Sequence, residues 1–163
     1  MSALFSDLFL KRISEEKFLE EFHATRETIG GRILDMLEKG LLEKDRHSIE
    51  SAIPLMYHFG ISREYLGHLN ALALEPWHGR HEDVVFALGK LKDPSSTDVL
   101  SATAIAEYPY LEDDEAFALG TKSIYALENI GTPEAIRKIG ELAKSENAIL
   151  KATAINRLKN TVK

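Results

Sequence analysis

Residues Phe86 to Pro94 read FALGKLKDP, and residues Tyr125 to Pro133, 39 positions later (125 − 86), read YALENIGTP. Both copies place an aromatic residue before Ala-Leu, and both continue with an aliphatic residue, a capping residue and a proline. A third copy of the first part, Ala154 to Leu158, begins 28 positions after Ala126 (154 − 126). Similarity to itself at such intervals is typical of proteins built from stacked helical repeats.

Each position of this repeat has a physical role. Ala87 and Ala126 are small enough to let two helices approach closely, while the leucines and isoleucines fill the space between hairpins. Asp93 and Thr132 are suited to cap the helix that follows, and the proline fits its first turn, where a missing N–H costs no hydrogen bond. A single hairpin cannot bury its apolar face, so such units stack into a solenoid.

Helical spacing of apolar residues also runs through the first half of the chain. The pairs at four-residue steps are Leu4 and Leu8, Phe5 and Phe9, and Phe18 and Phe22. Ser14 is suited to cap the helix that contains the last pair, and Gly30-Gly31 to break or bend the next one. We expect a further helix over 46–59, closed by Gly60. No alternation of period two predicts a strand, so the predicted fold is all-α, with seven to nine helices.

The repeats at 82–160 resemble the short HEAT-like repeats related to those of phycobilin lyases. The resemblance implies an α-solenoid of stacked helical hairpins. We expect these repeat positions to be buried: Ala87, Leu88, Leu91, Ala126, Leu127, Ile130, Ile155 and Leu158. Nothing matches a bilin-attachment motif, and the chain contains no cysteine.

Composition narrows the function further. The 163 residues fit one domain, 1–163, with a formal net charge of −6. That charge disfavours general binding to nucleic acid and attracts a basic partner.

Asp7 lies within the first apolar stretch and no basic residue precedes it, which argues against a secretory signal. No apolar run is long enough to span a bilayer, so we expect a cytoplasmic protein without a membrane partner.

The two repeat intervals differ by 11 residues (39 − 28), and the extra length falls at 107–115. This insertion reads EYPYLEDDE and holds five acids, two tyrosines and no base. Insertions in solenoids lie on one face, often the binding face. Solvated surface is the simpler interpretation of an acidic loop, and it stays open here.

Tyrosine and carboxylate groups together suit the recognition of a basic protein surface. We therefore predict a partner-binding site at 107–115, and we expect this loop to contribute little to the core. The predicted site residues are Tyr108, Tyr110, Glu112, Asp113, Asp114 and Glu115, with His81 and Trp77 as neighbours. Trp77 has two interpretations, a partner anchor or a core residue wedged between hairpins.

The only cluster that suits metal binding or acid–base chemistry is His78-Gly79-Arg80-His81-Glu82-Asp83. Its part Arg80-His81-Glu82, followed by Ala87-Leu88-Gly89, resembles the His-Glu repeats of deoxyhypusine hydroxylase, a HEAT-like di-iron enzyme. That family needs several His-Glu pairs on successive repeats, whereas the position equivalent to His81 one repeat later is Gly120. We therefore predict no metal and no cofactor. His81, Glu82 and Asp83 are instead expected to open a helix, where the acids offset its dipole.

No catalytic motif is present, so the chain is not predicted to be an enzyme. A small, acidic, cysteine-free HEAT-like protein resembles the immunity proteins of bacterial polymorphic or contact-dependent toxin systems. Such proteins neutralise a toxin, often a basic nuclease, by covering an essential surface. A generic adaptor or assembly factor is the alternative, followed by a metal-dependent hydroxylase or a nucleic-acid-binding protein. Residues 134–163 hold seven Lys/Arg against three Glu, which suits either nucleic acid or the polar end of a terminal repeat.

Overall fold

The computed structural model describes residues 3–112, 114 and 116–161. These residues form ten α-helices and three short 3-10 helices, and none of them lies in a strand. The all-α prediction is confirmed, but the predicted number of helices was too low. Four of the helices, α1, α2, α5 and α7, have only seven residues. Such helices hold too few apolar repeats to be counted from periodicity.

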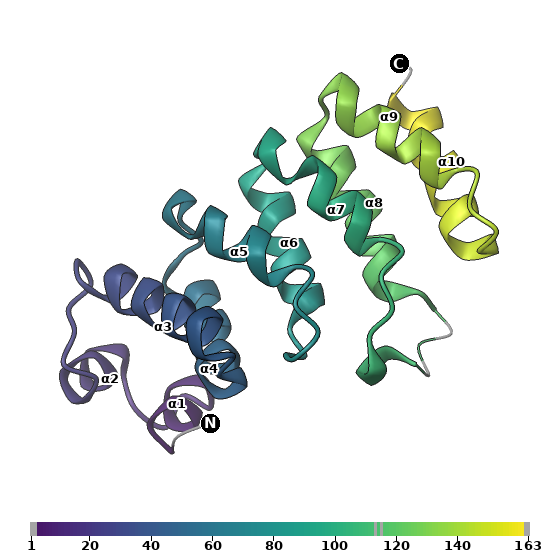
Figure 1. Cartoon of the computed structure of the whole chain (residues 1–163). Coiled ribbons are helices and arrows are strands. Elements are labelled where there is room, and N and C mark those ends of the chain that lie inside the picture. Colours follow the sequence, from purple (N-terminus) through teal and green to yellow (C-terminus); the bar gives the residue numbers. More distant parts are fainter. Residues whose placement is uncertain (1–2, 113, 115, 162–163) are drawn as a thin grey trace. The chain divides into compact units, whose positions relative to one another are not determined.

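The chain divides into two compact units between His68 and Leu69, and the helices are coloured along the sequence in Figure 1. The first unit contains α1 (Ala3–Phe9), α2 (Glu15–Glu21), α3 (Ile29–Glu43), α4 (Arg46–Phe59), the 3-10 turn η1 (Arg63–Tyr65) and the start of α5 (Leu66–Leu72). Within it α1 packs on α2, and α3 packs on α4. A single domain over 1–163 stays a prediction.

Phenylalanine rings hold the first two helices of this unit together. Phe18 stacks on Phe22 with 5.3 Å between the ring centroids, and Phe5 meets both rings edge-on at 5.7 and 5.6 Å. Ser14 caps α2 by accepting a hydrogen bond from the backbone N–H of Lys17. Gly60 closes α4, as predicted.

Gly30 and Gly31 do not break a helix, contrary to expectation. They lie in the first turn of α3, and the break comes before them because α2 ends at Glu21 and α3 begins at the buried Ile29. The carbonyl of Gly30 accepts a hydrogen bond from the hydroxyl of Tyr65. The glycine pair therefore opens α3 beside a buried tyrosine.

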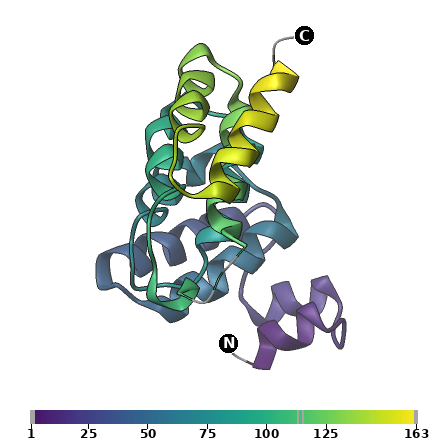
Figure 2. The same ribbon diagram turned by 90° about the vertical axis from the view of Figure 1, so that its right-hand side faces the viewer.

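The second unit contains the end of α5, then α6 (His81–Leu91), the 3-10 turn η2 (Pro94–Ser96), α7 (Thr97–Thr103), the 3-10 turn η3 (Pro109–Leu111), α8 (Ala118–Ile130), α9 (Pro133–Leu142) and α10 (Ala148–Thr161). Helix α8 packs against α6 and against α10, while α7 packs against α9 and both of these also contact α8. The unit thus has two layers, one of α6, α8 and α10 and one of α7 and α9. Figure 2 shows α10 lying beside α9.

The repeated sequence takes equivalent positions in this unit. The Asp93 side chain accepts a hydrogen bond from the N–H of Ser95 at 3.0 Å, and the Thr132 side chain accepts one from the N–H of Ala135 at 3.2 Å. A proline occupies the first turn after each cap, as predicted. Helices α6 and α8 approach so closely that a Cβ atom on Gly89 would lie 3.0 Å from the Cα of Ala126.

Four of the eight repeat residues that were expected to be buried are buried. Ala87, Leu88, Ala126 and Leu127 are buried, whereas Leu91, Ile130 and Leu158 are half-buried. The prediction for Ile155 was wrong, because its side chain is 37% exposed and its neighbour Ala154 is fully buried. Adjacent residues of a helix point about 100° apart, so a register error of one residue turns a side chain out of the core.

The length and the hydropathy of a helix decide whether it can cross a membrane. None of the helices in the described part of the chain is both long and apolar enough to cross a bilayer.

Candidate functional site

The insertion predicted to bind a partner is anchored by Tyr108. This side chain is only 5% exposed, and its hydroxyl donates a hydrogen bond to the carbonyl oxygen of Ala73 at 2.9 Å. Its ring stacks on the ring of His81, with 3.8 Å between the centroids. The expectation that the loop contributes little to the core was therefore wrong for Tyr108. The carbonyl of Ala73, directly after α5, also accepts a hydrogen bond from the hydroxyl of Thr103, so it holds both side chains in the interior.

His81 opens α6, with Glu82 and Asp83 in the first turn, as predicted. Its ring is fully buried, and its Nε2 lies 2.8 Å from the carbonyl oxygen of Glu75. A carbonyl can only accept, so Nε2 carries the proton and Nδ1 is left as an acceptor. The hydroxyl of Tyr110 donates to that Nδ1 at 2.8 Å. Both ring nitrogens are thus bonded within the protein.

His78 and Trp77 extend the stack. The ring of His78 lies parallel to that of His81 at 4.1 Å, and the indole of Trp77 meets His78 edge-on at 5.3 Å. His78 accepts the backbone N–H of Arg80 at Nδ1 and donates from Nε2 to the carbonyl of Leu72. We call the five rings of Trp77, His78, His81, Tyr108 and Tyr110 the ring cluster.

Trp77 falls between its two interpretations. Its side chain is half-buried, and its indole N–H donates to the carboxylate of Glu75 at 2.6 Å. The indole therefore contacts the ring cluster while part of the side chain remains exposed. This arrangement holds the loop before α6 in place.

Burial sets the protonation of the cluster. It lowers the pKa of His81 to about 4, with the neighbouring His78 acting in the same direction. It also raises the pKa of Tyr108 and of Tyr110 to about 12. At neutral pH the imidazole of His81 is uncharged and both tyrosines keep the protons that they donate.

The side chains of His81 and Glu82 are both engaged within the protein. The carboxylate of Glu82 forms an ion pair with Lys122, and His81 has no free nitrogen. In the portion of the chain that the structure describes, no three His, Cys, Asp or Glu side chains come together as a metal-binding group.

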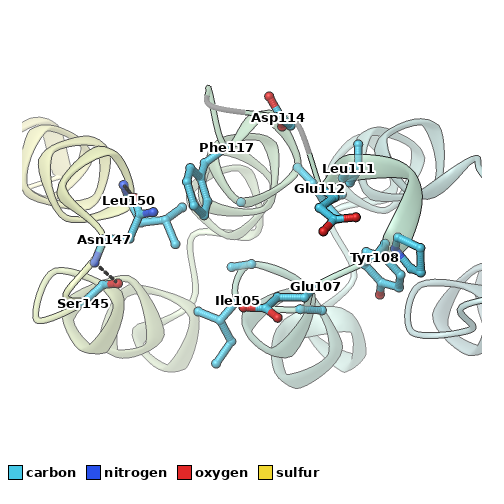
Figure 3. A pocket seen from close by; sticks show the side chains of 15 residues that line it. Ile105, Glu107, Tyr108, Leu111, Glu112, Asp114, Phe117, Ser145, Asn147 and Leu150 are labelled. Atoms are coloured by element: carbon cyan, nitrogen blue, oxygen red, sulfur yellow. Dashed lines mark hydrogen bonds between the residues drawn. The ribbon is translucent and has the colours of Figure 1, made fainter.

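A groove lies on the other side of Tyr108, within the second unit. Its volume is about 920 Å³, and Figure 3 looks into it. The lining residues come from the end of α7, the insertion, the start of α8, the α9–α10 connection and α10: Ala104, Ile105, Ala106, Glu107, Tyr108, Pro109, Leu111, Glu112, Asp114, Phe117, Leu119, Gly120, Ser145, Asn147 and Leu150. We call this the acidic groove.

One wall of the acidic groove is apolar. Phe117 and Leu150 lie next to each other on one side of it, and Ile105 lies below them in the view of Figure 3. Ile105 is 64% exposed and Phe117 is 43% exposed. Phe117 is held there by a left-handed backbone (φ 48°) directly before α8. The wall is therefore open to a ligand.

Three carboxylates lie around the same groove. Asp114 is used by the fold, because it accepts hydrogen bonds from the backbone N–H groups of Ala116 and Ala118 at 3.2 and 2.7 Å and so supports the start of α8. Glu107 and Glu112 are exposed, and neither side chain forms an ion pair with any described residue. No lysine or arginine is among the described residues that line the groove. Two negative charges thus remain without a counter-charge.

The predicted site residues fall into two neighbouring features. Trp77, His81, Tyr108 and Tyr110 belong to the ring cluster, and Tyr108, Glu112 and Asp114 line the acidic groove. Asp113 and Glu115 lie outside the described residues. The sequence placed His78 in a cluster suited to metal or acid–base chemistry and did not indicate that its ring stacks on His81. Sequence reasoning also missed the apolar wall, since no local pattern marks Ile105 or Phe117 as exposed.

The ring cluster fixes the insertion, and the acidic groove is the surface that the insertion helps to form. Both features belong to the second unit. Comparison of the chain with protein-family models, with curated proteins and with solved structures found no match.

Proposed function

We propose that this chain is a non-catalytic binding module that recognises a basic protein through the acidic groove. The observation that carries the proposal is the position of Glu107 and Glu112, without counter-charges, beside the exposed Ile105 and Phe117. A partner that supplies lysine or arginine would form charge-assisted hydrogen bonds there. Burial of the apolar wall would add a favourable term that is independent of charge.

The ring cluster supports the proposal because it positions the insertion before a partner arrives. Tyr108 and Tyr110 each donate a hydrogen bond to a group outside the insertion. A loop that is already ordered loses less conformational entropy on binding, so more of the contact energy appears as affinity.

The proposed fold is a HEAT-like solenoid. Two layers of helices in the second unit, together with the repeated cap and proline, support this assignment. A fold does not by itself supply chemistry, and function resides in the site that the fold presents. The buried and doubly bonded His81 supports a structural role over a general base, which must reach its substrate.

Within this class we propose an immunity protein that acts in a bacterial cytoplasm and neutralises a basic toxin domain. The net charge of −6 supports this choice, because it favours rapid association with a basic partner. An adaptor is the second candidate. An adaptor needs a second binding surface, and the exposed rings of Phe86 on α6 and Tyr125 on α8 could supply one. These two residues occupy equivalent positions of the repeat, and each has a cation over its ring.

The test is to purify the chain together with the product of the neighbouring gene and to map the contact by hydrogen exchange. We expect a stable complex in which backbone amides at 104–120 become protected. A complex that protects only other segments, or no complex at all, would contradict the proposal. Rescue of growth when that product is expressed as a toxin separates an immunity protein from an adaptor.

A further inference from the structure

We propose that the acidic groove receives a segment of the partner protein in which a large apolar side chain stands beside a lysine or arginine. This inference rests on the proposed function and adds the chemistry of the segment that binds.

The size of the groove indicates more than one bound side chain. Pockets for small ligands occupy roughly 300–1,000 Å³, and the acidic groove, at about 920 Å³, lies near the upper end of that range. A single lysine side chain would fill a small part of it. Several consecutive residues of an extended or helical segment fit this volume.

The apolar requirement comes from Ile105, Phe117 and Leu150. Leu150 is buried at the base of the wall, while Ile105 and Phe117 remain exposed beside it. A purely charged ligand would leave Ile105 and Phe117 in water. A leucine or phenylalanine of the partner would contact these two side chains and remove their surface from water.

The cationic requirement comes from Glu107 and Glu112. Glu107 directly precedes the buried Tyr108, and Glu112 directly follows η3, so both carboxylates are attached to anchored backbone. Neither has an ion pair with another described residue, and Asp114 is engaged in capping. A lysine or arginine next to the apolar anchor would meet these two carboxylates, and an acidic segment would be repelled.

The experiment uses the full chain, labelled with ¹⁵N, and three capped peptides. The first peptide is GKFKLG, the second replaces both lysines by glutamate, and the third replaces phenylalanine and leucine by serine. Spermine serves as a fourth probe that has charge without an apolar group. We expect GKFKLG alone to shift the amide signals of residues 104–120 and 147–150, with an affinity at least about tenfold above the other probes.

Two variants and their matched controls decide which side chains are responsible. Glu107→Gln/Glu112→Gln and Ile105→Ser should each weaken the binding of GKFKLG by about fivefold or more, the effect of losing ~1 kcal/mol. Glu38→Gln/Glu64→Gln removes the same charge from exposed positions in the first unit, and Leu42→Ser removes an exposed leucine there. Both controls should bind as the wild type does.

Equal binding of spermine or of the serine peptide would overturn the apolar requirement, and equal binding of the glutamate peptide would overturn the cationic one. Shifts confined to other residues would overturn the location. If a partner protein binds but GKFKLG does not, the inference fails while the proposed function stands. If GKFKLG binds and no basic protein does, the proposed function fails instead.

Discussion

The hydroxyl of Tyr110 donates a hydrogen bond of 2.8 Å to Nδ1 of His81, which lies 29 positions earlier in the chain. The bond joins the acidic insertion to the first residue of α6. Because the other nitrogen of His81 is held by the carbonyl of Glu75, the imidazole has one orientation and one tautomer. The insertion is thereby tied to a buried group rather than to the surface.

Removing this hydroxyl should destabilise the fold. Tyr110→Phe leaves the buried Nδ1 without a donor, and we expect the free energy of unfolding to fall by about 1–2 kcal/mol. Tyr125→Phe is the control, since Tyr125 is 40% exposed, close to the 44% of Tyr110. The contact between Tyr125 and Arg157 is made by the ring, which the substitution keeps. That change should cost at most about 0.5 kcal/mol. Urea denaturation measures both, and equal values would show that the bond contributes nothing.

Acidification should destabilise the chain through His81. Its pKa is about 4 in the folded protein and about 6.5 in an unfolded chain. As the pH falls below about 6.5 the unfolded state takes up the proton first, so stability is lost between about pH 6.5 and pH 4. The free energy of unfolding should fall by about 1–3 kcal/mol. The fall is limited because solvent beside the half-exposed Tyr110 screens part of the cost of protonating His81 in the folded protein.

The comparison with His81→Phe isolates this effect. The variant lacks the titrating group, so its free energy of unfolding should fall less between pH 7 and pH 4.5 than that of the wild type. Urea denaturation at the two pH values gives the difference. Parallel pH profiles would contradict a buried neutral His81.

Truncation of two repeat residues should have unequal effects. Leu127 is fully buried, so Leu127→Ala should lower the free energy of unfolding by about 2–5 kcal/mol. Ile155 is 37% exposed, and Ile155→Ala should cost less than about 1 kcal/mol. Thermal or chemical denaturation distinguishes the two. Similar losses would place Ile155 in the core after all.

Two glycines of the second unit should respond in opposite directions to alanine. A Cβ atom on Gly120 would lie 2.6 Å from the carbonyl oxygen of Ala104 and would also meet the side chain of Leu150. Gly120→Ala should therefore destabilise by about 1–3 kcal/mol. Gly140 has nothing within 4 Å of such an atom, and Gly140→Ala should stabilise by about 0.5–1 kcal/mol through helix propensity. A stabilising Gly120→Ala would contradict the packing of α8.

Local features of the fold were predictable from the sequence. Caps at Ser14 and Asp93 and the closure of α4 at Gly60 depend on residues within one turn, and the structure has each of them. Ile155 was misplaced because the short copy Ala154 to Leu158 does not define which residue of α10 faces α8. Helix number was underestimated because short helices depend on tertiary packing rather than on periodicity.

The candidate site was predictable only in part. A break in the repeat marked the insertion, but nothing in EYPYLEDDE indicates that Tyr108 turns inward to Ala73. That contact joins residues 35 apart and depends on the path of the chain. The role of Asp114 is local, because its carboxylate accepts hydrogen bonds from residues two and four positions later, but a run of acids does not show which of them supports α8. Charge reversal at Asp114 would disturb the fold, so Glu107 and Glu112 are the better positions to change.

The most direct test of binding at the acidic groove is the association rate constant of the co-purified basic partner, measured at about 50 mM and about 300 mM salt. For Glu107→Lys/Glu112→Lys we predict a rate about tenfold or more below the wild type at low salt, with a weaker dependence on salt, because these charges steer the encounter. Glu38→Lys/Glu64→Lys, the same charge change on the first unit, should stay within about twofold of the wild type. If the two double variants associate at the same rate, the acidic groove is not where the partner binds.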